Sequence, residues 1–278
     1  MAIEATKVAA MVYAVVATII LVVMLRRGKF NRRIGYLFLA ISVALGFFIF
    51  APMLPYQFQL LLMGKIKQLG MPVAIPAIFL SMFVVLSFAF GRIFCGYVCP
   101  IGAAQELLYL LPGKKLKVTN KTITTAFRIG FLIAFVILAA GFSIGLLRYL
   151  GVKEFFNVDT GVVFFWVFLI IVVISALVYR PFCRLACPYG ALLSLAVIKG
   201  RFKLRRNENC INCKKCGEAC PTAEVGWTDF KQECYMCNRC KEVCPVEGME
   251  YTRRLVREQD RKKKASMSPK PATAESGR

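Results

Sequence analysis

Eight cysteines near the C-terminus fall into two strings of identical spacing, and this spacing constrains the fold more than any other feature of the sequence. The strings are Cys210-x2-Cys213-x2-Cys216-x3-Cys220-Pro221 and Cys234-x2-Cys237-x2-Cys240-x3-Cys244-Pro245. Three closely spaced cysteines wrap a loop around one face of a compact metal core, and the fourth ligand must come from elsewhere. Because a 4Fe–4S cluster needs four converging thiolates, the spacing predicts two such clusters.

Each string is expected to lend its fourth cysteine to the other cluster, as in bacterial ferredoxins that hold two clusters. The predicted ligands of the first cluster are Cys210, Cys213, Cys216 and Cys244. The predicted ligands of the second are Cys234, Cys237, Cys240 and Cys220. Zinc favours one tetrahedral set that often includes histidine, and this chain has no histidine. Disulfides need an oxidising compartment and do not require this spacing.

The residues before the strings are too apolar for a soluble protein. Hydrophobic residues make up 58% of the chain, and residues 1–179 contain only four acidic side chains. Five apolar runs approach the ~20 residues that cross a bilayer as a helix. They are residues 8–25, 34–53, 73–90, 123–147 and 162–179. The predicted fold is therefore an all-α polytopic membrane bundle of about five transmembrane helices, followed by a small α+β ferredoxin domain of the bacterial two-cluster type.

Basic residues fix the expected orientation. The formal net charge is +22, and most of the basic side chains lie in alternate connections between the runs and after the last run. The positive-inside rule then places the N-terminus outside and the ferredoxin domain and C-terminus in the cytoplasm, in a multi-pass protein of the inner, cytoplasmic membrane. This topology signal explains the charge, so no nucleic-acid partner is expected.

Three segments follow from these patterns. Residues 1–199 are expected to form the transmembrane domain, and residues 200–252 the ferredoxin-like domain. Residues 253–278 are strongly polar and basic, which is typical of a disordered tail.

The transmembrane segment also contains an internal repeat with four further cysteines. Arg92-Ile93-Phe94-Cys95-x3-Cys99-Pro100-x-Gly102 matches Arg180-Pro181-Phe182-Cys183-x3-Cys187-Pro188-x-Gly190, 88 residues later. Proline disfavours helical geometry at the preceding cysteine and is well suited to begin a helix. If pseudo-symmetry relates the copies, Cys95, Cys99, Cys183 and Cys187 converge at the cytoplasmic membrane face. Three interpretations stay open: an additional iron–sulfur cluster, a metal-binding or redox-active thiol site, and cysteine used as a small packing residue.

A quinone, menaquinone or ubiquinone, is a further candidate cofactor. Gln105 and Glu106 follow the first motif and are placed to exchange protons near the surface, although the favoured interpretation of them is an ordinary interfacial helix. No Gly-rich fingerprint for a nicotinamide or flavin dinucleotide follows a strand, and no Cys-x-x-Cys-His motif for haem attachment occurs.

The paired Cys-x3-Cys-Pro motifs and the two strings together resemble the NapH family of membrane-bound ferredoxin-type proteins, over residues of about 73 to 250. The resemblance implies cytoplasmic clusters and electron transfer between membrane quinol and other redox proteins, as a subunit of a quinol dehydrogenase. The implied partners are a periplasmic reductase, a cytochrome or another ferredoxin-type subunit. The chain departs from that family in its fifth predicted span.

Related FixG/CcoG and NosR-type proteins share parts of the pattern. The first group implies an alternative function, a copper reductase or assembly factor for a respiratory oxidase. A third hypothesis is a membrane redox sensor. No catalytic residue can be named from the sequence, and the main hypothesis is an integral membrane electron-transfer protein that contains two 4Fe–4S clusters.

Overall fold

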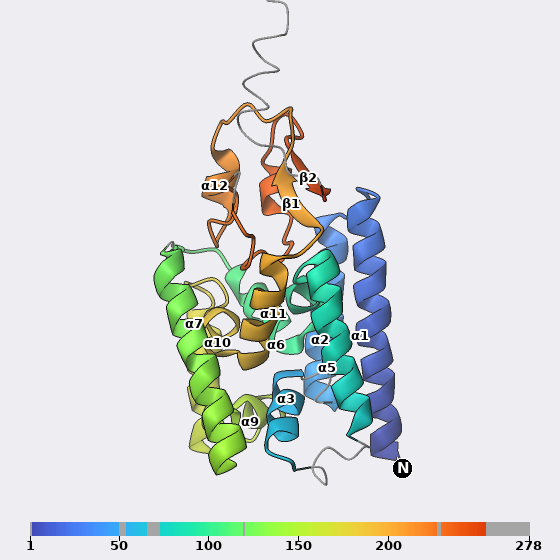
Figure 1. The fold of residues 1–278 in the computed structure, drawn as a ribbon. Coiled ribbons are helices and arrows are strands. Elements are labelled where there is room, and N and C mark those ends of the chain that lie inside the picture. The colour runs from blue at the N-terminus through green and yellow to red at the C-terminus, as the bar shows by residue number, and fades with distance from the viewer. Residues whose placement is uncertain (1, 50–53, 66–72, 119, 227–228, 254–278) are drawn as a thin grey trace, which may run out of the picture.

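The helices of the computed structural model surround two short central helices, and the cysteine strings lie at one end of this bundle (Figure 1). The structure describes residues 2–49, 54–65, 73–118, 120–226 and 229–253. The predicted tail, apart from its first residue, lies outside the described residues. The N-terminal end of α1 lies at the opposite end from the strings (Figure 1).

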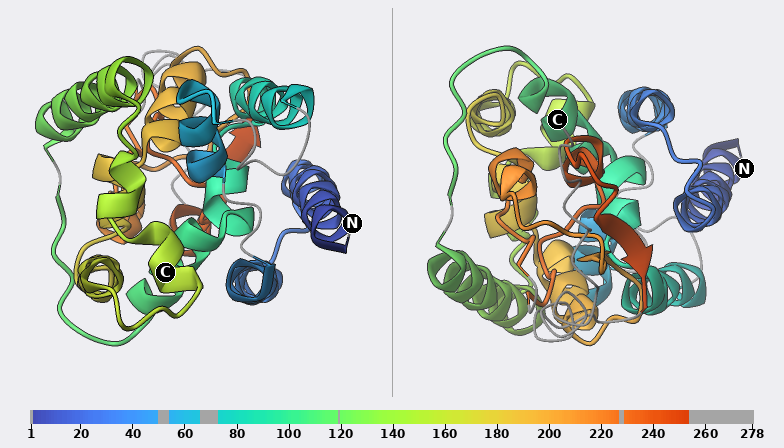
Figure 2. Two further views of the ribbon diagram at one scale, coloured as in Figure 1. Left: turned by 90° about the horizontal axis from the view of Figure 1, so that it is seen from below. Right: turned by 90° about the horizontal axis from the view of Figure 1, so that it is seen from above.

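Apolar helices form the periphery of the part of the chain that the structure describes (Figure 2). They are α1 (Ala2–Arg26), α2 (Arg32–Ile49), α5 (Ala74–Phe90), α7 (Lys121–Val136) and α10 (Val163–Ile174). Three helical stretches are long and apolar enough to cross a membrane, namely Val8–Arg26, Arg32–Ile49 and Lys121–Gly141. The last of these combines α7 with the π-helical turn Ile137–Gly141. The described residues therefore contain three candidate membrane spans, and α5 and α10 are shorter apolar helices.

The fourth and fifth predicted spans are longer than the helices that form. The prediction of one run over 123–147 is wrong at its end, because the helical stretch stops at Gly141. The run predicted over 162–179 is helical only to Ile174. Beyond α10 the Ala176 carbonyl accepts a hydrogen bond from Lys115 Nζ at 2.8 Å, and the Leu177 carbonyl accepts from the Leu116 N–H at 2.9 Å. Pairing with residues 115–116 thus takes these carbonyls out of the helix.

The two central helices are α6 (Pro100–Tyr109) and α11 (Pro188–Ile198). Each begins with the proline of a Cys-x3-Cys-Pro motif, as predicted, and most of its residues are buried. α6 stops shortly before Pro112 and Gly113, and α11 stops shortly before Gly200, which are residues that disfavour a helix interior. The peripheral helices therefore enclose the repeat region on several sides (Figure 2).

Three further short helices lie at the end that carries the N-terminus. They are α3 (Leu54–Leu62), α8 (Leu146–Tyr149) and α9 (Val152–Phe156). The Gln59 side chain joins two of them, because its Oε1 accepts the Leu147 N–H at 2.8 Å. Gln59 is buried, so this hydrogen bond fixes α3 against α8 at the end remote from the strings.

In the sequence, the cysteine strings lie between two strands that pair with each other in antiparallel fashion. The strands are β1 (Lys203–Arg206) and β2 (Met249–Thr252), and Leu204 pairs with Tyr251 in their register. Two short helices, α12 (Lys215–Ala219) and α13 (Arg239–Glu242), complete this part. The sheet joins the two ends of residues 203–252, so both strings are held in one small unit (Figure 1).

Candidate metal centres

Each Cys-x3-Cys-Pro motif has the same local structure. A π-helical turn holds the first cysteine, Phe94–Val98 in one copy and Phe182–Ala186 in the other. The second cysteine is extended, with ψ of 121° at Cys99 and 109° at Cys187, and the following proline is the first residue of α6 or α11. The clash between proline and the preceding residue favours this extended geometry. The π-turn lets the two cysteines of a copy face the same side without a continuous α-helix.

The four motif cysteines surround one cavity. Cys95, Cys99, Cys183 and Cys187 are all buried and all line it. The other lining residues are Pro55, Arg92, Phe94, Ile101, Tyr189 and Gly190. We call this the membrane cysteine site. The structure thus brings together the residues that pseudo-symmetry predicts to converge, in surroundings that are apolar apart from Arg92 and the Tyr189 hydroxyl.

Hydrogen bonds from both copies reach the sulfurs of this site. Gln105 Nε2 lies 3.5 Å from Cys183 Sγ, and the Gly190 N–H donates to Cys187 Sγ at 3.2 Å. Gln105 also accepts the Phe182 N–H, and it is fully buried. Gln105 is therefore an internal contact between the two copies. The hypothesis that it exchanges protons near the surface is wrong for this reason.

The two C-terminal strings repeat each other in backbone conformation. Asn212 and Met236, at equivalent positions, have φ of 58° and 56°. Lys214 and Asn238 are equivalent as well, with φ of 64° and 63°, and each precedes its short helix, α12 or α13. These left-handed residues turn the chain tightly between successive cysteines. Both strings therefore form the same wrapped loop.

The strings form two cavities, and each has cysteines from both strings. One cavity is lined by Cys220 together with Cys234, Cys237 and Cys240. The other is lined by Cys210, Cys213 and Cys216 together with Cys244. We call the first the proximal site, because Tyr179, the residue before the second motif copy, lines it, and the second the distal site. The grouping of the cysteines coincides with the two predicted ligand sets.

The three sites follow one another in space. Met249 lines both the proximal and the distal cavity. Tyr235 lines the proximal cavity, and its ring lies 4.5 Å from the guanidinium of Arg92, which lines the membrane cysteine site. The Gly96 backbone approaches the Tyr235 carbonyl so closely that a Cβ on Gly96 would collide with it. The order is therefore membrane cysteine site, proximal site, distal site.

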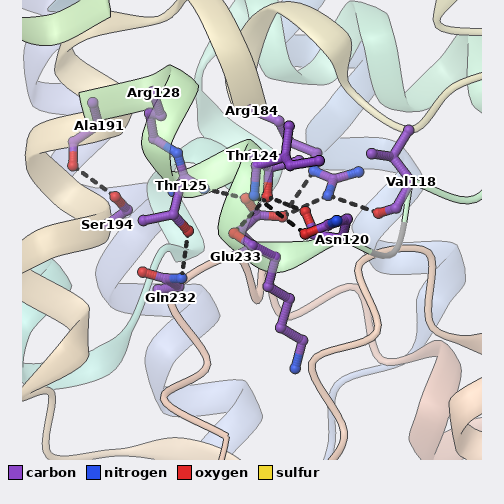
Figure 3. Close-up of polar contacts among 12 residues, drawn as sticks. Val118, Asn120, Thr124, Thr125, Arg128, Arg184, Ala191, Ser194, Gln232 and Glu233 are labelled. Carbon is purple, nitrogen blue, oxygen red and sulfur yellow. Dashed lines mark hydrogen bonds and ion pairs between the residues drawn. The ribbon is translucent and has the colours of Figure 1, made fainter. Parts of the chain in front are cut away.

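Two buried carboxylates hold the second string against the transmembrane part. Glu233 pairs with Arg128 and with Arg184, the latter at 2.7 Å (Figure 3). Glu106 pairs with Arg180 at 2.9 Å and with Arg239 at 2.6 Å. Burial alone would raise the pKa of the Glu106 carboxyl, but Arg180 and Arg239 outweigh it and lower that pKa. Glu106 is thus an ionised structural group, and its predicted proton exchange near the surface is wrong.

A large polar cleft lies at the end of the bundle remote from the strings. It has a volume of about 780 Å³, and α3 lies between it and the membrane cysteine site. Pro55 lines the membrane cysteine site, whereas the next residue, Tyr56, lines the cleft. The charged residues of the cleft are Lys65, Arg148, Lys153 and Glu154.

The donor sets fit iron–sulfur clusters. All twelve cysteines are unpaired thiols, in three groups of four, and four thiolates are the usual ligands of a cubane cluster. Backbone N–H groups donate to sulfur at Cys187 and at Cys244, where Gly248 N is 3.1 Å from Sγ. Within the described residues, no three His, Cys, Asp or Glu side chains lie close enough together to hold a single metal ion. The sulfurs instead line cavities.

A comparison with known families agrees with the repeat. A model described as a 4Fe-4S binding domain matches residues 72–119 and 160–207. Each match contains one Cys-x3-Cys-Pro motif, and the two matches have the same offset as the sequence repeat. Of the three interpretations of the membrane cysteines, the iron–sulfur cluster is the one that this family description fits.

Curated relatives point in the same direction. An uncharacterized protein of Methanocaldococcus jannaschii is 35% identical over 156 residues, which cover 51% of this chain and 63% of that protein. The putative electron transport protein YccM of Escherichia coli is 28% identical, covering 54% of this chain and 46% of YccM. The ferredoxin-type protein NapH of Haemophilus influenzae is 27% identical, covering 49% of each. The matches thus span about half to two thirds of these relatives, and no solved structure matches the chain.

Sequence reasoning missed the charged residues that connect the sites. Arg92 and Arg180 begin the two motif copies, and Arg128 interrupts an otherwise apolar run. A charge in so apolar a segment is itself a signal, because it is expensive unless it has a partner. The partners, Glu106 and Glu233, lie 74 and 105 residues away from Arg180 and Arg128 in the sequence.

Proposed function

This chain fits the NapH-type family of membrane ferredoxins, and we propose that it is an integral membrane protein that carries electrons through three 4Fe–4S clusters in series. One observation carries the proposal: each of three adjacent cavities is lined by four of the twelve cysteines. The electron-transport and ferredoxin-type names of the relatives support an electron-transfer role.

The proposed ligands are the lining cysteines of each site. Cys95, Cys99, Cys183 and Cys187 would hold one cluster, Cys234, Cys237, Cys240 and Cys220 the second, and Cys210, Cys213, Cys216 and Cys244 the third. A 4Fe–4S cluster supplies one-electron chemistry at a potential that its surroundings set. The protein excludes water from the membrane cysteine site, since all four of its cysteines are buried, and it exposes Cys213 at the distal site.

The order of the sites gives a path. The membrane cysteine site lies within the helix bundle, the proximal site is joined to it through Tyr235 and Arg92, and the distal site shares Met249 with the proximal one. A partner on the side of the strings would exchange electrons at the distal site, because its cavity contains the exposed Cys213. The buried Glu106 and Glu233 pairs keep the proximal site at a fixed distance from the helices.

The proposed orientation has the strings on the cytoplasmic side of the inner membrane, with the N-terminus outside. Basic connections that the positive-inside rule assigns to one side do contact the string region. Arg32 pairs with Glu242 at 3.1 Å, the Arg26 guanidinium lies 5.0 Å from the Phe202 ring, and Lys117 donates to the Glu218 carbonyl. Arg26 and Arg32 belong to the connection between the first two runs and Lys117 to the connection between the third and fourth, so these contacts support a shared side for both connections.

We further propose membrane quinol as the donor or acceptor at the other end of the path. The polar cleft lies on the N-terminal side and adjoins α3, whose Pro55 lines the membrane cysteine site and whose Tyr56 lines the cleft. A polar headgroup needs a few hydrogen-bonding groups at such a place, and Tyr56 and Tyr149 line this cleft. A cytochrome or another ferredoxin-type subunit would take the remaining place, at the distal site on the side of the strings. A periplasmic reductase would lie on the opposite side of the membrane, at the quinol end of the path.

The decisive experiment counts clusters in full-length protein purified without oxygen. Three clusters require about 12 iron and about 12 acid-labile sulfide per chain, whereas the strings alone would hold about 8 of each. The double variant C95S/C183S is expected to remove one EPR signal and about a third of the iron. C213S is the matched variant, and it should affect a different signal. Unchanged iron in C95S/C183S, or copper or zinc at that site, would contradict the three-cluster proposal.

The quinol step is tested separately. Menaquinol added to the oxidised protein should reduce at least one cluster, and dithionite defines full reduction. Clusters that dithionite reduces and that neither menaquinol nor ubiquinol reduces would argue against quinol as the donor. Dithionite-reduced clusters that neither menaquinone nor ubiquinone reoxidises would argue against quinone as the acceptor. Either result leaves the electron-transfer path intact.

A further inference from the structure

The arginine that begins each motif copy reaches into the other copy. A Cβ added to Gly102 would lie 3.1 Å from Arg180 Nη1 and would collide with the Cys95 carbonyl. A Cβ added to Gly190 would lie 3.0 Å from Arg92 Nη2 and 3.2 Å from the Cys183 carbonyl. The glycine two residues after the proline of each motif therefore leaves room for the guanidinium of the arginine from the opposite copy. This crossed arrangement follows the sequence repeat.

The two arginines differ in what they bind. Arg180 is fully engaged: Nε donates to Glu106 Oε2 at 2.9 Å, Nη2 donates to the Gly96 carbonyl at 2.7 Å, and Nη1 donates to the Cys95 carbonyl. Arg180 does not line the membrane cysteine site. Its role is to join the two copies and to neutralise Glu106.

Arg92 has only one hydrogen bond among the described residues. Its Nη1 donates to the Gln232 carbonyl at 3.3 Å, while Nε and Nη2 are buried without a hydrogen-bond partner in the part of the chain that the structure describes. The side chain is 0% exposed, and it lines the membrane cysteine site. None of the ion pairs among the described residues includes Arg92.

A buried guanidinium without a counter-charge is strongly unfavourable. The ring of Tyr235, 4.5 Å away, compensates only part of this penalty. The cavity that Arg92 lines offers no other polar side chain apart from four cysteines and Tyr189, whose hydroxyl already donates to the Leu80 carbonyl at 2.8 Å. An anionic thiolate-bound centre is the acceptor that fits two free N–H groups in this place.

We propose that Arg92 is the resident counter-charge of the membrane cysteine site, donating hydrogen bonds to the sulfurs of its cluster and raising the reduction potential of that cluster. The inference rests on the proposed cluster at Cys95, Cys99, Cys183 and Cys187. Reduction adds a negative charge, and a fixed cation nearby stabilises the reduced form. Hydrogen bonds to the sulfurs act in the same direction. Arg92 is thus a positioning and tuning residue, placed between the membrane cysteine site and Tyr235 of the proximal site.

The test is a potentiometric EPR titration of the full-length protein and of the variant R92Q. We expect R92Q to keep its iron and to make reduction of the membrane-site cluster at least tenfold less favourable, which is a downward shift of about 59 mV for a one-electron couple. The signals of the other two clusters should move less. R26Q is the matched control, because it removes the same charge from an exposed position 5.0 Å from the Phe202 ring. An unshifted midpoint in iron-replete R92Q would overturn the inference.

A second measurement needs no substitution and covers the case in which R92Q does not assemble. In wild-type protein grown with isotope-labelled arginine, pulsed EPR should detect coupling between an arginine nitrogen and the cluster whose signal C95S/C183S removes. R92K, which retains the charge, should lose that coupling and keep its iron. Absence of arginine coupling in the wild type would overturn the proposed hydrogen bonds from Arg92 to the sulfurs of the membrane-site cluster. If the wild type lacks the membrane-site signal altogether, the three-cluster proposal and this inference both fall.

Discussion

Glu233 directly precedes Cys234, and its carboxylate accepts a hydrogen bond from Nε of Arg184, the residue that directly follows Cys183, at 2.8 Å. A neighbour of a string cysteine is therefore bound to a neighbour of a membrane-site cysteine. Arg128 of α7 donates to the other carboxylate oxygen (Figure 3). The proximal site is consequently held in place by side chains next to its own predicted ligands.

Substitution of Glu233 by glutamine is expected to destabilise the protein strongly. It leaves Arg128 and Arg184 buried without their carboxylate, and breaking a buried ion pair in this way costs about 3–5 kcal/mol. The measurement is denaturant unfolding in detergent. Glu242→Gln is the control, because its pair with Arg32 is partly exposed and should contribute at most about 1 kcal/mol. Equal effects of both substitutions would contradict the docking role of Glu233.

Glu106→Gln is expected to lower the melting temperature by an amount that does not change with pH above the ordinary carboxyl range. Because Arg180 and Arg239 lower the pKa of Glu106, the folded state binds its proton less readily than the unfolded state does. The stabilisation is therefore complete above the unfolded pKa, and it is lost as the pH falls through the folded one. Thermal melts of both proteins between about pH 8 and pH 5 test this expectation. A difference that already shrinks within that range would contradict it.

Gly96→Ala should separate the proximal site from the helix bundle. A Cβ at this position collides with the Tyr235 carbonyl. The colliding oxygen belongs to the backbone, so it cannot swing aside as the end of a flexible side chain could. We expect weaker magnetic coupling between the membrane-site and proximal clusters, and slower electron transfer between them. Gly130→Ala is the matched control, because nothing lies within 4 Å of the added Cβ in α7. If the two variants behave alike, close approach at Gly96 is unimportant for the path.

Removal of iron should unfold residues 203–252 while the helix bundle persists. The helices α12 and α13 have only five and four residues, and each strand has four, so none of them is stable without ligands to the cysteines. Hydrogen exchange after anaerobic chelation should increase across β1, β2, α12 and α13. Amides of α1 and α7 should keep their protection. Unchanged exchange in the strands would argue that packing alone folds this region.

Local chemistry made much of the protein predictable from its sequence. Proline after Cys99 and Cys187 predicted the start of α6 and α11, because ring geometry acts on adjacent residues. The apolar composition predicted membrane helices, and three candidate spans are present among the described residues. The end of the fifth run was not predictable, because Lys115 Nζ and the Leu116 N–H take up the Ala176 and Leu177 carbonyls, 61 residues further along the chain.

The spacing of the cysteines was enough to predict which of them belong together, because metal ligation demands a fixed local geometry. The tertiary structure decided which groups surround them. Only folding brings Arg92 against the opposite copy, Glu233 against Arg128 and Arg184, and Glu106 between Arg180 and Arg239. Such contacts depend on the distance and direction of long side chains from remote segments, and these follow from how the helices pack rather than from any local pattern.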